Sequence, residues 1–482
     1  MITIQPFNAP LDLLRNLGDY ASGIVYPRLR LGVTGLSRSG KTVFTTALVH
    51  HLTNGTPMPV FRASSEGRIR RAVLDDQPDD DVPRFPFEEH LATLGEPQRH
   101  WPESTERIAE LRIAVDYESQ SSWRGGPSSL AIDIVDYPGE WLADLALIDQ
   151  DYATWSRETL AASRKSGRED IAGPWHALLA ALDPEQPAPE AEILRLSETF
   201  KAYLAALRAG PQRVATTPPG RFLMPGDLAG SPALTFSPLD LAPGAEAKPR
   251  SLHAQMERRY DAYRNHVVRP FFRDHFARLD RQIVLVDVLS ALDAGPVALA
   301  ELEDALDRVL MAFRAGRNTV LSTLFSPRID RVLFAATKAD HLHRTDHARL
   351  EAILRLLVDR ALRRTRSAGA RVETLALASV RATREGSVRS GRDTLPAIIG
   401  TPEAGEDIGG EVFDGRSEAA IFPGELPDDP HAVFNGAVEP GSLRFPRFRP
   451  PRREPDAAGR LPPLPHIRLD RALEFLLGDK LA

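Results

Sequence analysis

The sequence predicts an α/β fold with a mostly parallel sheet, a large helical insertion and an irregular C-terminal appendage. Short apolar runs rich in Val, Ile and Leu alternate with helix-like stretches, which is typical of parallel strands buried on both faces. These runs cover residues 29–33, 111–117, 130–135, 282–289, 331–336 and 372–378. A long segment of different character separates the run at 130–135 from the run at 282–289.

The composition shifts along the chain predict its organisation. Apolar residues recur at helical spacing between the two halves of the sheet, for example Ile193, Leu196, Phe200, Tyr203 and Leu207. Residues 211–249 are rich in Pro and Gly and are expected to form a long loop or lid. We expect an N-terminal helical segment at 1–27, a core domain in two parts at 28–143 and 281–385, a helical insertion at 144–280, and a C-terminal wrap-around segment at 386–482.

The composition also excludes several classes of protein. The chain contains no Cys, so disulfides, thiolate catalysis and cysteine-bound metals are excluded, and a reducing compartment is favoured. A formal net charge of -6 argues against nucleic acid as the main partner. Neither a leader-like N-terminus nor a membrane-length apolar run is found. We therefore expect a cytoplasmic protein with no intrinsic membrane anchor.

A phosphate-binding loop is predicted where the first apolar run ends. Residues 35–42 read GLSRSGKT and match G-x-x-x-x-G-K-[ST] between a strand and a helix. Gly35 and Gly40 allow the sharp turn and the close approach of backbone to phosphate. Lys41 is expected to neutralise the β and γ phosphates, and the Thr42 hydroxyl to bind Mg²⁺. We assign nucleotide binding to Ser37, Ser39, Gly40, Lys41, Thr42 and Val43.

Arg38 occupies a position inside this loop that the pattern leaves open. Its guanidinium could touch phosphate in the same chain, or reach a second copy across a nucleotide-dependent dimer. An ordinary solvated loop arginine is the alternative.

A second phosphate element follows the run at 130–135, where the chain reads DYPGEW. Asp136 is expected to hold Mg²⁺ from the end of the strand, and the Gly139 amide to sense a γ-phosphate. A plain Asp-x-Pro-Gly turn is the alternative. Glu140 follows directly and could orient or activate water, although its negative charge beside a triphosphate is unfavourable.

A base-reading element is predicted after the run at 331–336, where the chain reads ATKAD. The Asp340 carboxylate can accept the N1–H and N2 amine of guanine together, and Lys338 can lie along the ring. His341 is expected near the base. The next run leads to Ser379 and Val380, whose backbone is expected to contact the guanine carbonyl.

A switch hydroxyl for Mg²⁺ is expected between the phosphate loop and the second strand, within WPESTERIAEL. Thr105 is the first candidate and Ser104 the alternate, with a helix-capping role as the competing interpretation. Trp101 is expected either on the nucleotide or in the core. His50 and His51, at the end of the helix after the phosphate loop, are expected at the surface.

These elements, in this order, resemble the motifs of P-loop GTPases. More narrowly, GLSRSGKT, DYPGEW, ATKADH, ASVRAT and the terminal PHIRLDRALEFLLGDKL resemble the YcjX-like family of bacterial P-loop GTPases over most of the chain. The resemblance implies a stress-associated, cytoplasmic protein that binds GTP or GDP, with a membrane-protein partner.

From the residues we predict Mg²⁺-dependent hydrolysis of GTP, with Lys41, Glu140 and Arg38 as the catalytic candidates. A nucleotide-gated scaffold that does not hydrolyse GTP, and an ATPase, are the alternatives. The absence of a glutamine after Gly139 favours the scaffold.

Overall fold

The computed structural model describes residues 27–35, 38–95, 99–103, 107–120, 126–165, 167–209, 218–312, 329–359, 370–390, 392–408, 410–436, 438, 442–457 and 459–482. The predicted N-terminal helical segment therefore lies outside the described residues except for its last position. Ser37, Ser104 and Thr105 also lie outside them, so the structure says nothing of their predicted roles.

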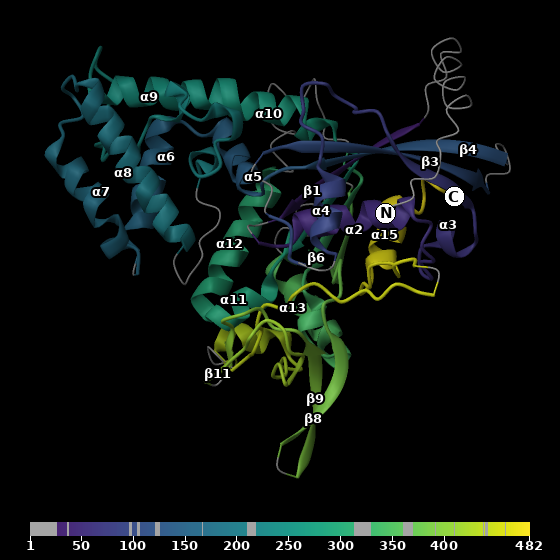
Figure 1. The fold of residues 1–482 in the computed structure, drawn as a ribbon. Helices are drawn as coiled ribbons and strands as arrows, with labels where there is room; N and C mark the ends of the chain where they lie inside the picture. The colour runs from purple at the N-terminus through teal and green to yellow at the C-terminus, as the bar shows by residue number, and fades with distance from the viewer. Residues whose placement is uncertain are drawn as a thin grey trace.

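The centre of the molecule is a sheet that has seven strands within the described ranges, in the order β2-β3-β4-β1-β5-β6-β7 (Figure 1). Strands β4, β1, β5, β6 and β7 run parallel, while β2 and β3 are antiparallel to their neighbours. This confirms the predicted fold class. The strands are β1 Arg28–Gly35, β2 Ile69–Asp75, β3 Ala109–Ser119, β4 Gly126–Asp136, β5 Arg281–Val286, β6 Arg331–Ala336 and β7 Arg371–Ala376.

Each predicted apolar run overlaps a strand, but the run at 372–378 extends two residues beyond β7, and two further details differ. The run at 282–289 is too long, because β5 ends at Val286 and helix α11 Val288–Ala294 begins two residues later. Strand β2 was not predicted at all. Its sequence, IRRAVLD, has only three consecutive apolar residues between charged ones, and among the described strands it lies at the edge of the sheet.

Both faces of the sheet are covered. Alternate residues of β5 divide between two hydrophobic clusters, with Ile283 and Leu285 on one face and Val284 and Val286 on the other. The first cluster includes helices α2 Lys41–Thr53 and α15 Leu469–Leu477. The second includes α11 and α13 His347–Leu357, with the apolar face of α12 Pro296–Ala312. Short helices α3 Arg62–Ser65 and α4 Phe87–Thr93 lie near α2.

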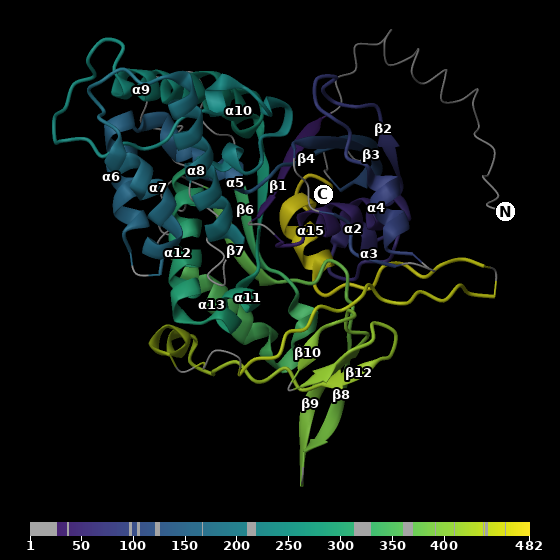
Figure 2. The ribbon, with the colours of Figure 1, turned by 60° about the vertical axis from the view of Figure 1, so that its left-hand side comes forward.

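Between β4 and β5 the chain forms a group of helices on one side of the sheet, seen in both views (Figure 2). After α5 Glu140–Asp144 come α6 Tyr152–Ser163, α7 Glu169–Ala181, α8 Glu190–Ala209, α9 Leu252–Tyr263 and α10 Arg269–Asp274. The five apolar residues predicted to share a helical face are all buried in α8. Their cluster continues onto the sheet, so the boundaries 144 and 280 stay a prediction.

The predicted lid at 211–249 is partly packed into this core. In its described part, from residue 218, the chain makes short 3-10 turns, and Phe236 is fully buried.

Beyond β7 the chain forms a small three-stranded sheet that the sequence did not predict, built from β8 Arg384–Ser390, β9 Asp393–Gly400 and β12 Ala419–Ile421. The β8–β9 hairpin projects from the body in both views. An irregular stretch then returns to the central sheet and ends in α15. The predicted wrap-around C-terminal segment and its bounds, 386–482, stay a prediction.

Candidate nucleotide-binding site

The predicted motif residues gather at one edge of the sheet because the parallel strands end together. Val33 of β1 is level with Asp136 of β4, and Val286 of β5 is level with Ala336 of β6. Ala336 is in turn level with Ala376 of β7. Every motif loop follows one of these strand ends, so the structure brings the phosphate and base elements to the edge where α/β sheets bind ligands.

In the loop after β1, two glycines occupy positions where the backbone conformation or the lack of space requires glycine. Gly40 has a φ of 86°, in the left-handed region that favours glycine. A Cβ on Gly35 would lie 2.4 Å from Leu285 O and 2.4 Å from Ser39 Oγ, so only glycine fits there. Arg38 also has a positive φ, of 63°, and its side chain is exposed.

Lys41 is the first residue of α2 and is buried against the loop. Its Nζ donates a hydrogen bond to Gly35 O at 3.0 Å, which points the ammonium group back across the loop. Ser39 Oγ is buried and has no hydrogen-bond partner among the described residues. Val43 is half-buried against the hydrophobic cluster of α2.

The predicted Mg²⁺ residues lie on either side of this loop. Thr42 Oγ1 donates a hydrogen bond to Glu103 O at 3.2 Å, so the chain just before the predicted switch hydroxyls rests on Thr42. Asp136 is fully buried at the end of β4. Among the described residues no group of three or more His, Asp or Glu side chains could hold a metal. An ion bound largely through nucleotide phosphates needs no such group.

Gly139 and Glu140 form the start of α5. The Glu140 side chain is 2% exposed, and its Oε1 lies 3.2 Å from a guanidinium nitrogen of Arg208 in α8. Glu140 is thus an ion-paired, buried carboxylate rather than a solvated one. Sequence reasoning missed Arg208, and the sequence carries no signal for it.

The base-reading loop after β6 turns sharply at Lys338, which has a φ of 60°. Lys338 Nζ lies 2.5 Å from Asp287 Oδ2, at the end of β5. Asp340 is buried, and its Oδ2 accepts a hydrogen bond from Ala382 N at 2.8 Å. Each carboxylate oxygen can accept two hydrogen bonds, so the Asp340 carboxylate can still accept hydrogen bonds from a base. Asp287 was missed, although an acidic residue directly after a buried parallel strand is a signal that could have found it.

The loop after β7 carries Ser379 and Val380, both buried. It is joined to the C-terminal segment, because Ala378 and Ile467 exchange backbone hydrogen bonds of 3.1 and 2.8 Å. Arg381 N also donates to Pro465 O at 2.6 Å. The C-terminal segment therefore braces the predicted guanine loop from behind.

The C-terminal segment also joins Trp101 to His341. The Trp101 indole N–H donates to Phe448 O at 2.6 Å, and the Phe448 ring meets His341 edge-on with ring centroids 5.3 Å apart. Burial lowers the pKa of His341, which keeps this imidazole neutral. Trp101 packs on the core cluster of α2, which is one of its two predicted positions.

The prediction that His50 and His51 lie at the surface is wrong. His51 is 1% exposed and His50 is 7% exposed. The His466 ring of the C-terminal segment lies 5.0 Å from that of His51, centroid to centroid. A segment remote in sequence thus covers the end of α2, and the local pattern could not reveal it.

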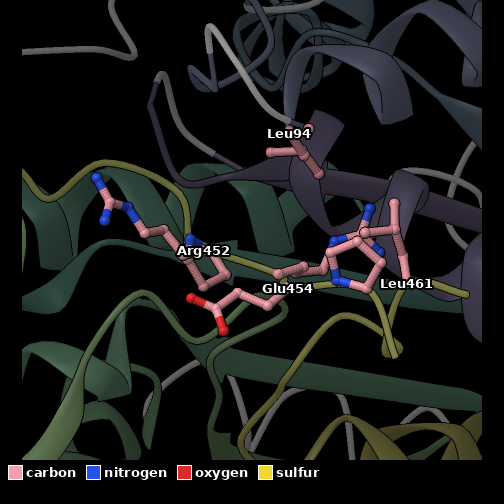
Figure 3. Close-up of a pocket in the computed structure, with 8 residues that line it drawn as sticks. Leu94, Arg452, Glu454 and Leu461 are labelled. Atoms are coloured by element: carbon pink, nitrogen blue, oxygen red, sulfur yellow. The ribbon is translucent and has the colours of Figure 1, made fainter. Parts of the chain in front are cut away.

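A separate cavity of about 440 Å³ lies between the end of α4 and the proline-rich C-terminal segment (Figure 3). Leu94 lies across it from Arg452, Glu454 and Leu461. None of the predicted nucleotide-binding residues lines this cavity.

The residues fit a bound guanine nucleotide and Mg²⁺. A loop that only glycine fits, a buried lysine and a Ser39 hydroxyl without a partner in the described part of the chain suit phosphate, and Asp340 suits guanine. Within the described ranges, every helix is too short or too polar to span a bilayer.

The sheet order, the loop after β1 and the succession of motif loops define the class of protein: a P-loop NTPase fold with the motif order of GTPases. The chain belongs to the YcjX-like family, because the model described as "YcjX-like family, DUF463" matches residues 29–481.

Two relatives carry the name Ras-like GTPase YcjX. The protein of Escherichia coli is 39% identical over 468 residues, which cover 94% of this chain and 96% of that protein. The protein of Shewanella oneidensis is 33% identical over 480 residues, covering 94% of each chain.

Proposed function

We propose that this chain binds GTP at the edge of the sheet and hydrolyses it to GDP and phosphate with Mg²⁺, acting as a molecular switch. One observation carries the proposal: the loops after β1 and β6 both open at this edge, and one bears a buried lysine while the other bears a buried aspartate. Only β5 separates these strands, so the two loops are about 10 Å apart. The name of the relatives, Ras-like GTPase, supports the same activity.

In this mechanism the chain stabilises the charge on the phosphates. The loop amides and the Lys41 ammonium donate to phosphate oxygens, while Thr42 and Asp136 would hold Mg²⁺. Bound Mg²⁺ would neutralise part of the phosphate charge. The Gly139 amide would report whether the γ-phosphate is present, and Glu140 would orient water.

Base selection would come from Asp340. Its carboxylate can accept the N1–H and N2 amine of guanine, whereas adenine offers no such donor pair. Lys338, held by Asp287, would lie along the ring, with Ser379 and Val380 contributing backbone contacts.

Calorimetry with GTP, GDP and ATP tests binding, using the wild-type chain, Lys41→Ala and Asp340→Ala. We expect tight binding of GTP and GDP only, loss of both with Lys41→Ala, and loss of the guanine preference with Asp340→Ala. Equal binding of ATP by the wild-type chain would favour the ATPase alternative. Phosphate release measured with Mg²⁺ and with a chelator tests hydrolysis.

The second candidate function is a nucleotide-gated scaffold without turnover. The residue that follows Gly139 is a glutamate and not the glutamine that would orient an attacking water, and this favours the scaffold. GTP binding without phosphate release under all conditions would establish this scaffold and reject the hydrolase.

The family resemblance further supports a stress-associated role in the cytoplasm with a membrane-protein partner, which we retain as part of the proposal. Arg38 is exposed on the phosphate loop and would be the residue that reaches a second copy in a nucleotide-dependent dimer. Light scattering with GTP or GDP tests the dimer, and Arg38→Ala should abolish it.

A further inference from the structure

Helix α5 is the element that directly follows the predicted γ-phosphate sensor. It comprises residues Glu140–Asp144, all of them buried, and Gly139 immediately precedes it. Any movement of Gly139 toward or away from a phosphate must therefore be transmitted to α5. The helix packs against two short turns of the segment between β4 and β5, at 145–149 and 220–222, and against α12.

The end of α5 is fastened to that segment by Asp144. The amide of Gly220 donates to Asp144 Oδ1 at 2.7 Å, and the Tyr263 hydroxyl donates to Oδ2 at 2.5 Å. Arg221 N donates to the same Oδ2 at 3.3 Å. Arg221 also places its guanidinium 3.2 Å from the ring centroid of Trp141, the second residue of α5.

The start of α5 is held differently. A Cβ on Gly220 would lie 2.2 Å from Glu140 O, so the two backbones are in direct contact. The Glu140 side chain is buried and makes its ion pair with Arg208, near the end of α8. A buried carboxylate is costly unless a cation compensates it, and a triphosphate beside Gly139 would raise that cost further.

We propose that Arg208 is a positioning residue for Glu140, through which the helical segment between β4 and β5 governs hydrolysis and the response of α5 to the bound nucleotide. The proposal rests on the proposed function. The Arg208 guanidinium keeps the buried Glu140 carboxylate in one place while GTP occupies the site. Arg208 is 26% exposed, so a change in α8 can reach it without disturbing the core.

Four variants test this positioning role: Arg208→Ala, Arg208→Lys, Glu140→Gln and the double variant Arg208→Ala with Glu140→Gln. We expect Arg208→Ala to lower kcat at least about 10-fold while the Kd for GTP changes less than about 3-fold, with partial recovery in Arg208→Lys. In the Glu140→Gln background, Arg208→Ala should have no further effect on kcat. Arg195→Ala, at an exposed position of the same helix, is the matched control and should leave kcat unchanged.

The proposal is overturned if Arg208→Ala leaves kcat unchanged, or if its effect on kcat simply adds to that of Glu140→Gln. Thermal unfolding of each variant shows whether the substitution lowers the stability of the whole protein. Such a loss would lower kcat equally in the wild-type and Glu140→Gln backgrounds.

Hydrogen exchange separates this inference from the proposed hydrolysis. In the wild-type chain, replacing GDP with a non-hydrolysable GTP analogue should change the exchange of amides in both α5 and α8. In Arg208→Ala the change should be confined to α5. If the wild-type chain binds GTP without turnover, hydrolysis is rejected and this exchange measurement alone decides the role of Arg208. If the change in exchange reaches α8 equally in the wild-type chain and in Arg208→Ala, the positioning role of Arg208 is overturned.

Discussion

Lys338 Nζ lies 2.5 Å from Asp287 Oδ2, so the loop that is predicted to read the base is anchored to the end of the neighbouring strand. Asp287 also caps α11, accepting from Ser290 N at 3.1 Å and from Ser290 Oγ at 2.7 Å. Burial raises the pKa of Asp287, but Lys338 and Ser290 outweigh it and leave the pKa below its usual value. The carboxylate is therefore charged at neutral pH and holds the lysine stem in place.

We expect Asp287→Asn to weaken GTP and GDP binding to the same extent, by about 10-fold or about 1.4 kcal/mol. The neutral amide no longer fixes the ammonium group, so the Lys338 stem loses its position against the base, which both nucleotides share. Calorimetry measures this, with Asp293→Asn at an exposed position of α11 as the control. A loss restricted to GTP would contradict a role in base binding.

Asp340→Asn should reverse the base preference of the site. The amide oxygen can still accept from Ala382 N, so the loop should keep its fold. The amide N–H₂ opposes the donors of guanine but matches the C2 carbonyl of xanthine. We expect GTP affinity to fall about 100-fold and XTP affinity to rise above it. Competition between GTP, XTP and ATP measures this; a variant that still prefers GTP would remove Asp340 from base recognition.

Phe448→Ala should destabilise the protein by about 3 to 5 kcal/mol, because the ring is 1% exposed and its loss leaves a cavity. The same ring meets His341 beside Asp340, so nucleotide affinity should also fall. Urea unfolding with and without GDP measures both effects, and Phe448→Leu should show a smaller loss. Stability within about 1 kcal/mol of wild type would mean that the Phe448 ring adds little to the packing against His341.

The buried histidines should make the protein sensitive to acid. Burial, then His466 and His50, lowers the pKa of His51 to about 3. Burial and Arg453 lower that of His50 to about 4. Unfolded histidines titrate near 6.5 and so bind more protons than the folded ones below that pH, which means that stability falls as the pH falls through 6.5. At pH 5 each histidine should cost about 2 kcal/mol.

Unfolding in urea between pH 7.5 and pH 5 checks this expectation. His51→Gln should lose part of the pH dependence, whereas His431→Gln at an exposed position should retain all of it. An identical slope in wild type and His51→Gln would mean that His51 takes up protons without leaving its buried place.

Local patterns predicted the parts of this fold that depend on spacing. The buried strands carry continuous apolar residues, and the loop after β1 carries glycines where a positive φ and a close backbone approach require them. Edge strand β2 and the small sheet of β8, β9 and β12 were missed, because β2 and β8 carry charged residues, β12 has only three residues, and a proline interrupts the apolar residues of β9. The roles of the site residues stay predictions, and those of Ser37, Ser104 and Thr105 concern residues outside the described ranges.

By itself the sequence determined the class of the sheet, the order of the motif loops and the residue types that they carry, because these follow from periodicity and from short local patterns. Only the tertiary structure decided which side chains compensate one another. Arg208 meets Glu140, Asp287 meets Lys338, and the C-terminal segment covers His51. An ion pair or a buried ring depends on which distant segments pack together. Local sequence patterns do not indicate such contacts.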